Sequence, residues 1–154
     1  MKIPSSKPDL GSDFSGKNSQ LKILVFGNPL IEEDSLPLRI LPRLRKEFPE
    51  IEFKEFDPSE ELHEEGRNLI ILDAVQGIEK VILISDTKQL NTDNPRYSLH
   101  DFDLGITLKL LKKMDLIDSV QIIGVPMKMS EKKALEEVSA AIKSSLLSKS
   151  AKRS

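Results

Sequence analysis

The sequence predicts an α/β fold: a three-layer αβα sandwich with a mostly parallel five-stranded sheet and one antiparallel edge strand. Short apolar runs alternate with amphipathic helical patterns along the chain, which is typical of this class. The run over 68–72 is apolar almost throughout, as in a central parallel strand that is covered on both faces. Only residues 74–80 separate it from the run over 81–84, too few for a helical crossover, so that pair is expected to be antiparallel.

The first half of the chain alternates strand, helix and strand. Residues 21–26 form an apolar run that predicts a buried strand, and a Gly-Asn-Pro turn closes it. A leucine or isoleucine then recurs every four residues, which predicts a helix over 36–47. Pro42 lies inside this helix and is expected to kink it. Residues 51–56 alternate as a strand, and a short helix is expected near 59–66.

The second half repeats the pattern after the strands over 68–72 and 81–84. Leu104, Leu108 and Leu111 mark a helix over 102–114. The fifth strand covers 120–125 and ends at a proline. Ser130 can cap a last helix, whose apolar stripe is formed by Leu135, Val138 and Ile142.

Composition limits the class of protein. A chain of 154 residues with 38% hydrophobic residues fits one domain, which we place over 21–147 between a disordered tail at 1–20 and a basic tail at 148–154. The net charge of −2 does not favour nucleic acid or a membrane surface. The chain has no cysteine, no signal peptide and no apolar run of about 20 residues. We therefore expect a cytoplasmic monomer.

Polar residues that follow the predicted strands are the candidates for chemistry. In open α/β sheets, ligands bind beyond the carboxyl ends of the strands. Asp34 follows the first strand, Asp57 the second and Asp73 the third, while His100 precedes the second long helix. If the first and third strands are neighbours, Asp34, Asp73 and His100 can meet. Two carboxylates and one imidazole suit a divalent transition metal.

Each of these residues also has a purely structural interpretation. Asp73 could simply end its strand in a turn, and Asp34 could be a helix N-cap. A lone histidine such as His100 is most often structural or exposed. Other chemistries lack their motifs: the sequence has no GxGxxG, no GxxxxGK[ST], no GxSxG and no cysteine nucleophile. Metal or carboxylate chemistry remains.

Three segments of the chain resemble the hydrogenase maturation protease family. The stretch 23–30, ILVFGNPL, followed by Glu33-Asp34, is similar to the first motif of that family. Residues 71–75, ILDAV, resemble its second motif, and residues 98–104, SLHDFDL, resemble its third. The three motifs occur in the family's order, and the resemblance covers about residues 21–147.

The resemblance implies an endopeptidase that removes a C-terminal extension from the nickel-loaded large subunit of a nickel-containing hydrogenase. The precursor of that subunit is thus the expected partner. The family's metal-binding positions fall on Asp34, Asp73 and His100, with the two aspartates as catalytic residues. We assign Asn28 and Asp57 to substrate binding at the same rim. The expected metal is nickel carried by the substrate, with another divalent metal as an alternative.

Two segments depart from the family pattern. The glycine-rich turn expected after the second strand is replaced by DPSE at 57–60, and the loop after the fifth strand is short. Two other functions therefore stay open. The first is a non-catalytic, metal-binding maturation chaperone on the same fold. The second is a plain α/β ligand-binding domain whose acidic residues only cap helices.

Overall fold

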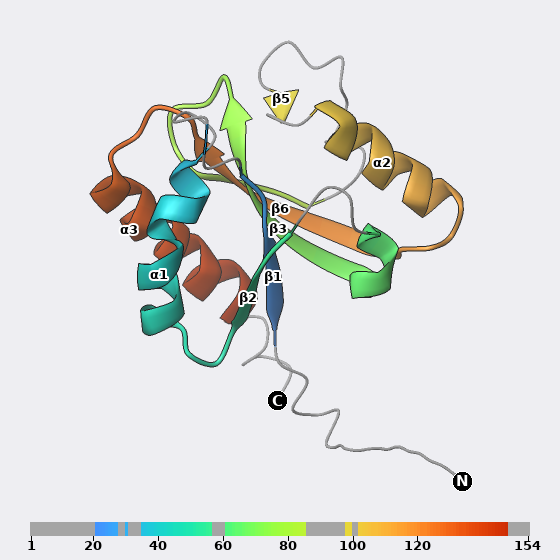
Figure 1. The fold of residues 1–154 in the computed structure, drawn as a ribbon, viewed down its shortest axis with the longest axis horizontal. Helices are drawn as coiled ribbons and strands as arrows, with labels where there is room; N and C mark the ends of the chain where they lie inside the picture. Colours follow the sequence, from blue (N-terminus) through green and yellow to red (C-terminus); the bar gives the residue numbers. More distant parts are fainter. Residues whose placement is uncertain are drawn as a thin grey trace, which may run out of the picture.

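A mostly parallel sheet forms the middle layer of the protein (Figure 1). The strands along the sheet are ordered β2-β1-β3-β6-β4. They cover Lys22–Val25 (β1), Glu52–Glu55 (β2), Asn68–Gln76 (β3), Ile82–Ile84 (β4) and Ser119–Pro126 (β6). The computed structural model describes residues 21–27, 30, 35–56, 61–85, 98–99 and 102–147. Both predicted tails lie outside the described residues.

The directions of the strands confirm the predicted fold class. β1 pairs in parallel with β2 and β3, and β3 pairs in parallel with β6. β4 is the antiparallel edge strand, but it pairs with β6 rather than with β3, its predecessor in the chain. A further strand was not predicted: β5 (Ser98–Leu99) has only two residues and pairs antiparallel with β3.

The helices begin close to the predicted positions. They are α1 (Leu36–Glu47), α2 (Phe102–Lys113) and α3 (Glu131–Ala141). The short helix expected near 59–66 is the four-residue 3₁₀-helix η3 (Leu62–Glu65), and α3 continues as the π-helix η5 (Ile142–Leu147). The Ser130 hydroxyl accepts a hydrogen bond from the backbone N–H of Lys133 at 3.1 Å, which confirms the predicted cap.

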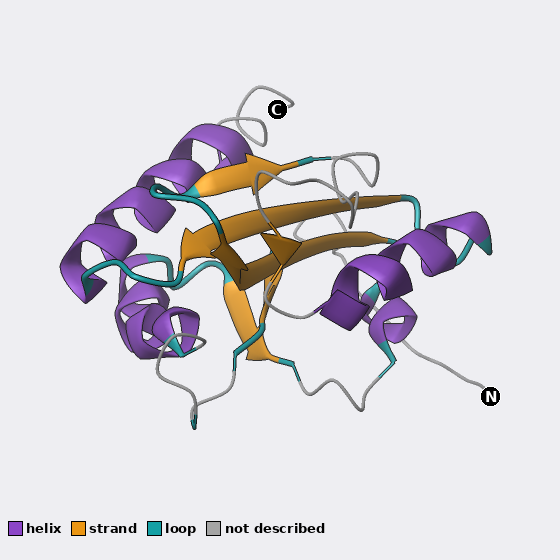
Figure 2. Cartoon of the chain, turned by 90° about the horizontal axis from the view of Figure 1, so that it is seen from above, coloured by secondary structure: helices purple, strands orange, loops and turns teal. Residues whose placement is uncertain are grey.

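The helices cover the two faces of the sheet in separate layers (Figures 1 and 2). On one face of the sheet, α1 and α3 pack against a core that includes Ile23, Leu72 and Ile123. On the other face α2 and η3 pack against Leu24, Ile71 and their neighbours. Because side chains alternate along a strand, each apolar run supplies both cores. None of the helices in the described part of the chain combines the length and hydrophobicity that a membrane crossing requires.

One ion-pair cluster fastens η3 to the sheet. The Glu65 carboxylate receives the Lys22 ammonium of β1 at 2.7 Å and the Lys54 ammonium of β2 at 2.6 Å. The side chain of Glu65 is only 10% exposed, so the attraction is less screened than at an open surface. These two hydrogen bonds hold the pKa of Glu65 below its ordinary value. The amino end of the sheet is thereby fixed to the short helix beneath α2.

Replacing Glu65 with glutamine should lower the free energy of unfolding by about 1 kcal/mol at neutral pH. A depressed folded-state pKa means that the contribution of the carboxylate is present above the unfolded pKa of about 4.3. It is lost as the pH falls through the folded value. The wild type and Glu65→Gln should therefore differ in urea denaturation at neutral pH and converge in acid. A constant difference at every pH would contradict the assigned role.

Candidate active site

The order of the strands places a topological switch point between β1 and β3. β1 lies between β2 and β3. The strand that follows β1 in the chain, β2, lies on one side of it, and the next strand, β3, lies on the other. Ligands of open α/β sheets bind at such a switch point, outside the carboxyl ends of the strands. The condition stated from the sequence, that the first and third strands are neighbours, is confirmed.

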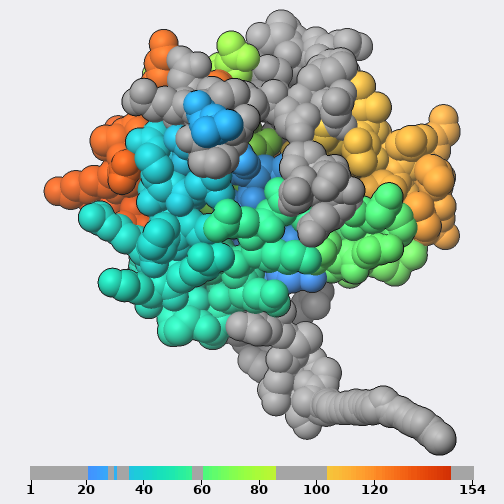
Figure 3. Space-filling view, in the orientation of Figure 1, coloured from blue at the N-terminus to red at the C-terminus, as the bar shows by residue number. Residues whose placement is uncertain are grey.

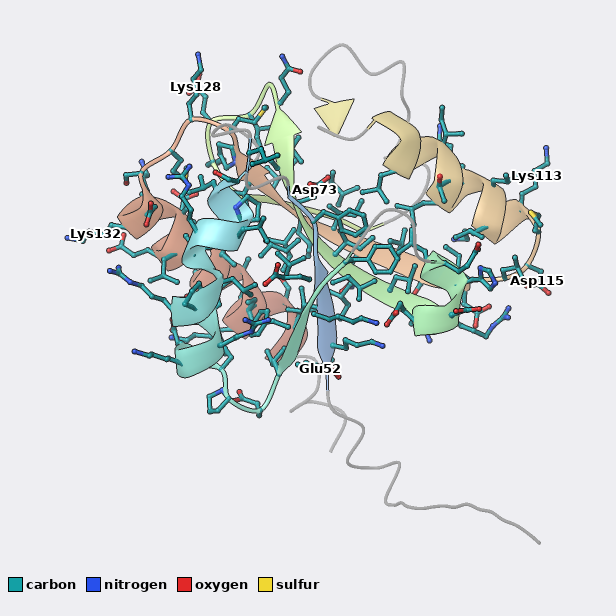
Figure 4. All side chains as sticks on the ribbon, in the orientation of Figure 1. Glu52, Asp73, Lys113, Asp115, Lys128 and Lys132 are labelled. Carbon is teal, nitrogen blue, oxygen red and sulfur yellow. The ribbon has the colours of Figure 1, made fainter. Side chains whose placement is uncertain are left out.

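Asp73 lies at this switch point and is buried. It is 1% exposed, one of three buried polar residues in the described chain. The last residues of β1 pair with Ile71 and Leu72, so Asp73 is the first residue of β3 beyond them. Asp73 lies two residues after Ile71 and therefore faces the α2 layer. Figure 4 places it in the middle of the molecule, between the two helical layers.

The strand does not end at Asp73. β3 continues to Gln76 and pairs with β6 throughout, so the interpretation of Asp73 as a turn residue is wrong. The Leu72 carbonyl accepts from the N–H of Phe26 at 2.9 Å, which shows that the even residues of β3 point their backbone groups towards β1. Beyond β1, the Ala74 N–H donates to Oδ1 of Asp73 at 2.8 Å. The Asp73 carboxylate thus accepts the hydrogen bond that Ala74 would otherwise donate to a neighbouring strand.

The short strand β5 pairs with β3 beyond the end of β1. Leu99 pairs with Val75 and Ser98 pairs with Gln76. β6 already occupies one edge of β3 along this stretch, so β5 lies on the same edge as β1. Asp73 therefore lies at the break between the end of β1 and the start of the pairing with β5.

Gly124 lies directly opposite Asp73 and leaves no space for a side chain. It pairs with Asp73 in β3 and with Ile82 in β4. A Cβ atom at this position would lie 2.7 Å from Cγ2 of Val75 and 3.3 Å from Cγ1 of Ile82. The sequence analysis placed this glycine inside the strand over 120–125 and assigned it no role of its own. The signal that it offered was a glycine inside an apolar strand, which marks a close approach.

The other predicted site residues lie outside the described residues: Asn28, Asp34, Asp57 and His100. Among the described residues, no three carboxylate or histidine side chains form a metal-binding group. The triad therefore stays a prediction, with Asp73 as its described member. The N-cap position of α1 is occupied by Ser35, whose side chain makes no capping hydrogen bond; the interpretation of Asp34 as a cap lies outside the described residues.

An open depression of about 420 Å³ lies at the same edge, beyond the carboxyl ends of β3 and β6. It begins three residues past Asp73 along β3. Two apolar residues, a glycine, a glutamine and a lysine line it, and none of them belongs to the three motifs. Its lining consists of Gln76, Gly77, Ile78, Met127 and Lys128.

Two solved structures share this arrangement of strands and helices. The [NiFe] hydrogenase maturation protease HybD from Thermococcus kodakarensis is similar with a TM-score of 0.56 and 19% identity, over 80% of this chain and 97% of that one. The hydrogenase maturating endopeptidase HybD from E. coli gives a TM-score of 0.53 and 18% identity, over 82% and 94%. The chain has the fold of the hydrogenase maturation proteases.

This finding confirms, for the fold, the resemblance that the three motifs indicated. No family model and no curated protein matches the sequence. The sequence identity to the two structures is below 20%. At that level the likeness shows a shared fold, and the activity has to be argued from the residues.

Proposed function

We propose that the chain is an endopeptidase of hydrogenase maturation, which removes a C-terminal extension from the nickel-loaded large-subunit precursor. The observation that carries the proposal is a buried carboxylate, Asp73, at the switch point of a fold shared with two such proteases. A carboxylate is rarely buried in a protein interior, because its desolvation is costly. A cation delivered by the substrate would interact strongly with this carboxylate, because charges are little screened in the interior.

The described neighbours of the remaining site residues support the proposed triad. Leu99, which precedes His100 in the sequence, is paired with Val75, two residues from Asp73. Ser35, which follows Asp34, is the buried N-cap residue of α1. Since β1 and α1 are consecutive, the chain between them has to pass the carboxyl end of β1. These described neighbours support the proposal that all three residues meet at this edge of the sheet.

Each residue has a specific role in the proposed reaction. Asp34, Asp73 and His100 bind the nickel of the precursor and thereby orient the peptide bond, which lowers the entropic part of the barrier. The carboxylate of Asp34 or Asp73 then accepts a proton from the attacking water. Asn28 and Asp57 bind the peptide at the rim. The depression next to Met127 and Lys128 offers room for the extension.

Incubating the full chain with nickel-loaded precursor should reduce the mass of the precursor by that of its C-terminal extension, as measured by intact-protein mass spectrometry. The nickel-free precursor is the matched control and should keep its mass, because it has no nickel for the triad to bind. A chaperone on the same fold would bind the loaded precursor without changing its mass. That outcome would replace the protease proposal with the non-catalytic alternative.

A further inference from the structure

Two buried side chains of β3 are directed towards opposite edges of the strand. Asp73 and Val75 are 1% and 0% exposed and lie on the same face, because side chains alternate along a strand. Oδ1 of Asp73 accepts from the Ala74 N–H at 2.8 Å, and this N–H faces the edge that β1 and β5 occupy. The methyl carbon Cγ2 of Val75 lies over the other edge, against Gly124 of β6. The carboxylate and the methyl group thus occupy separate sides of β3.

Gly124 makes room for the Val75 side chain. A Cβ atom at position 124 would lie 3.4 Å from Cβ of Val75 and 2.7 Å from its Cγ2, so the methyl group is directed towards the glycine. Carbon atoms pack at about 3.5–4.0 Å, so the present position of Val75 and a side chain at 124 exclude each other. Cγ1 of Ile82 closes the other side at 3.3 Å. Pairing with β3 and with β4 also fixes the backbone of Gly124 on both sides.

Because both flanks of position 124 are fixed, a side chain there would displace Val75. Rotation about χ1 would turn the branched end of Val75 away from β6 and towards the side of β3 that the Asp73 carboxylate occupies. A shift of the backbone would instead separate β3 from β6 and move Asp73 with it. In either case the Asp73 carboxylate and the Ala74 N–H lose their present arrangement.

We propose that Gly124 is a positioning residue of the candidate site. Because it has no side chain, Val75 stays over β6, and the β1 side of the strand is left to the Asp73 carboxylate. The role of Gly124 in cleavage rests on the proposed function, whereas its hold on the carboxylate does not. A glycine that served only the packing of β3, β4 and β6 would stabilise the fold without any effect on Asp73. The test separates these two roles.

The test uses four variants of the full chain. Gly124→Ala adds the excluded carbon atom, Val75→Ala removes Cγ2, and the double variant Gly124→Ala/Val75→Ala does both. Gly66→Ala is the matched control: Gly66 has a φ of 130°, which other residues rarely adopt, but no atom lies within 4 Å of its Cβ position. It directly follows η3, whose green side chains lie at the surface in Figure 3, before the amino end of β3. Gly66→Ala should therefore lower stability without touching the site.

Hydrogen exchange of the Ala74 amide, followed by NMR, reports the hydrogen bond to Asp73. Its rate is divided by that of the amide of Leu72, which lies in the part of β3 that is paired with β1, so that a general loss of stability cancels. We expect Gly124→Ala to raise this exchange ratio about tenfold and Gly66→Ala to leave it within about twofold. In the Val75→Ala background, adding Gly124→Ala should change the ratio by less than about twofold, since the contact between the two positions is gone.

Processing of the nickel-loaded precursor, measured by mass spectrometry, gives the second readout. For the folded fraction, Gly124→Ala should lower kcat/KM about 10–100-fold, because a displacement of about 1 Å at a reacting group has a cost of this size. The same substitution in the Val75→Ala background should lower kcat/KM by less than about twofold. Gly66→Ala should lower the melting temperature and leave kcat/KM within about twofold.

The outcomes separate this inference from the proposed function. An unchanged exchange ratio in Gly124→Ala would overturn the inference, as would a loss that persists in the Val75→Ala background or that Gly66→Ala reproduces. A raised exchange ratio with unchanged kcat/KM would overturn the role of Gly124 in cleavage. A wild type that does not cleave would remove the protease, and the exchange ratio would still decide whether Gly124 positions Asp73.

The double variant keeps the inference testable if Gly124→Ala does not fold. A double variant that folds with the exchange ratio of Val75→Ala supports the contact with Val75 as the reason for the glycine. A double variant that does not fold, although Val75→Ala does, would overturn that reason.

Discussion

Asp73→Asn is expected to abolish processing of the precursor, lowering kcat/KM by about 10²–10³-fold or more. Asparagine keeps the shape of the side chain and an oxygen that can accept from the Ala74 N–H, now at 2.8 Å from Oδ1. It removes the negative charge, so the side chain no longer attracts a cation and no longer acts as a base for the attacking water. Because Asp73 is buried, the charge of its carboxylate acts with little screening. Cleavage is followed by the mass of the large subunit.

The fold should survive this substitution. Exchanging a buried carboxylate for an amide of the same shape removes a desolvated charge, so the melting temperature should stay within a few degrees of the wild type or rise. Glu52→Gln is the matched control, since Glu52 is an exposed carboxylate at the amino edge of the same sheet (Figure 4). It should leave processing intact. Normal trimming by Asp73→Asn would remove Asp73 from the mechanism.

The elements with strong periodicity were predicted almost to the residue. Helix α1 covers the predicted range, 36–47, because its leucines and isoleucine recur at the helical period and Pro42 does not end it. The central strands were recognised by uninterrupted apolar runs, since both of their faces are buried. The reversed direction of β4 followed from the short connection alone.

Other elements had no local signal. β3 was expected to stop before Asp73, because a charged residue after an apolar run usually marks a strand end; pairing with β6 carries it on to Gln76. β5 has two residues, too few for any alternation. η5 follows the predicted stripe of α3 but changes to π-helical pairing, which the same apolar spacing does not distinguish.

The candidate site was predictable in part. The position of Asp73 after an apolar run indicated the carboxyl edge, and the neighbouring β1 and β3 supply the expected switch point. A glycine inside an apolar strand indicated a close approach at position 124, but the neighbours could not be named from the sequence, because the contacts with Val75 and Ile82 arise only when three strands are paired. The depression beside Lys128 likewise depends on two segments that lie some 50 residues apart in the chain.

Ile122→Ala is expected to cost about 2–5 kcal/mol of the free energy of unfolding. Ile122 is fully buried and pairs with Ile71 in β3 and with Ile84 in β4. Ile71 in turn pairs with Leu24 in β1, so the four side chains form one row across the sheet beneath α2. Truncating the middle of this row leaves a cavity that backbone pairing on both sides prevents from collapsing, and urea denaturation measures the loss.

The melting temperature should fall by roughly 10 °C, since 1 kcal/mol corresponds to about 2–4 °C in a chain of this size. Gln121→Ala is the control, because Gln121 is the partly exposed neighbour on the same strand and its loss should stay within about 0.5 kcal/mol. The row lies below the site and not in it, because Asp73 lies two residues beyond Ile71 on the same face. Ile122→Ala should therefore lower activity only where it lowers the folded fraction. A cost below about 1 kcal/mol would show that the row is not the centre of this core.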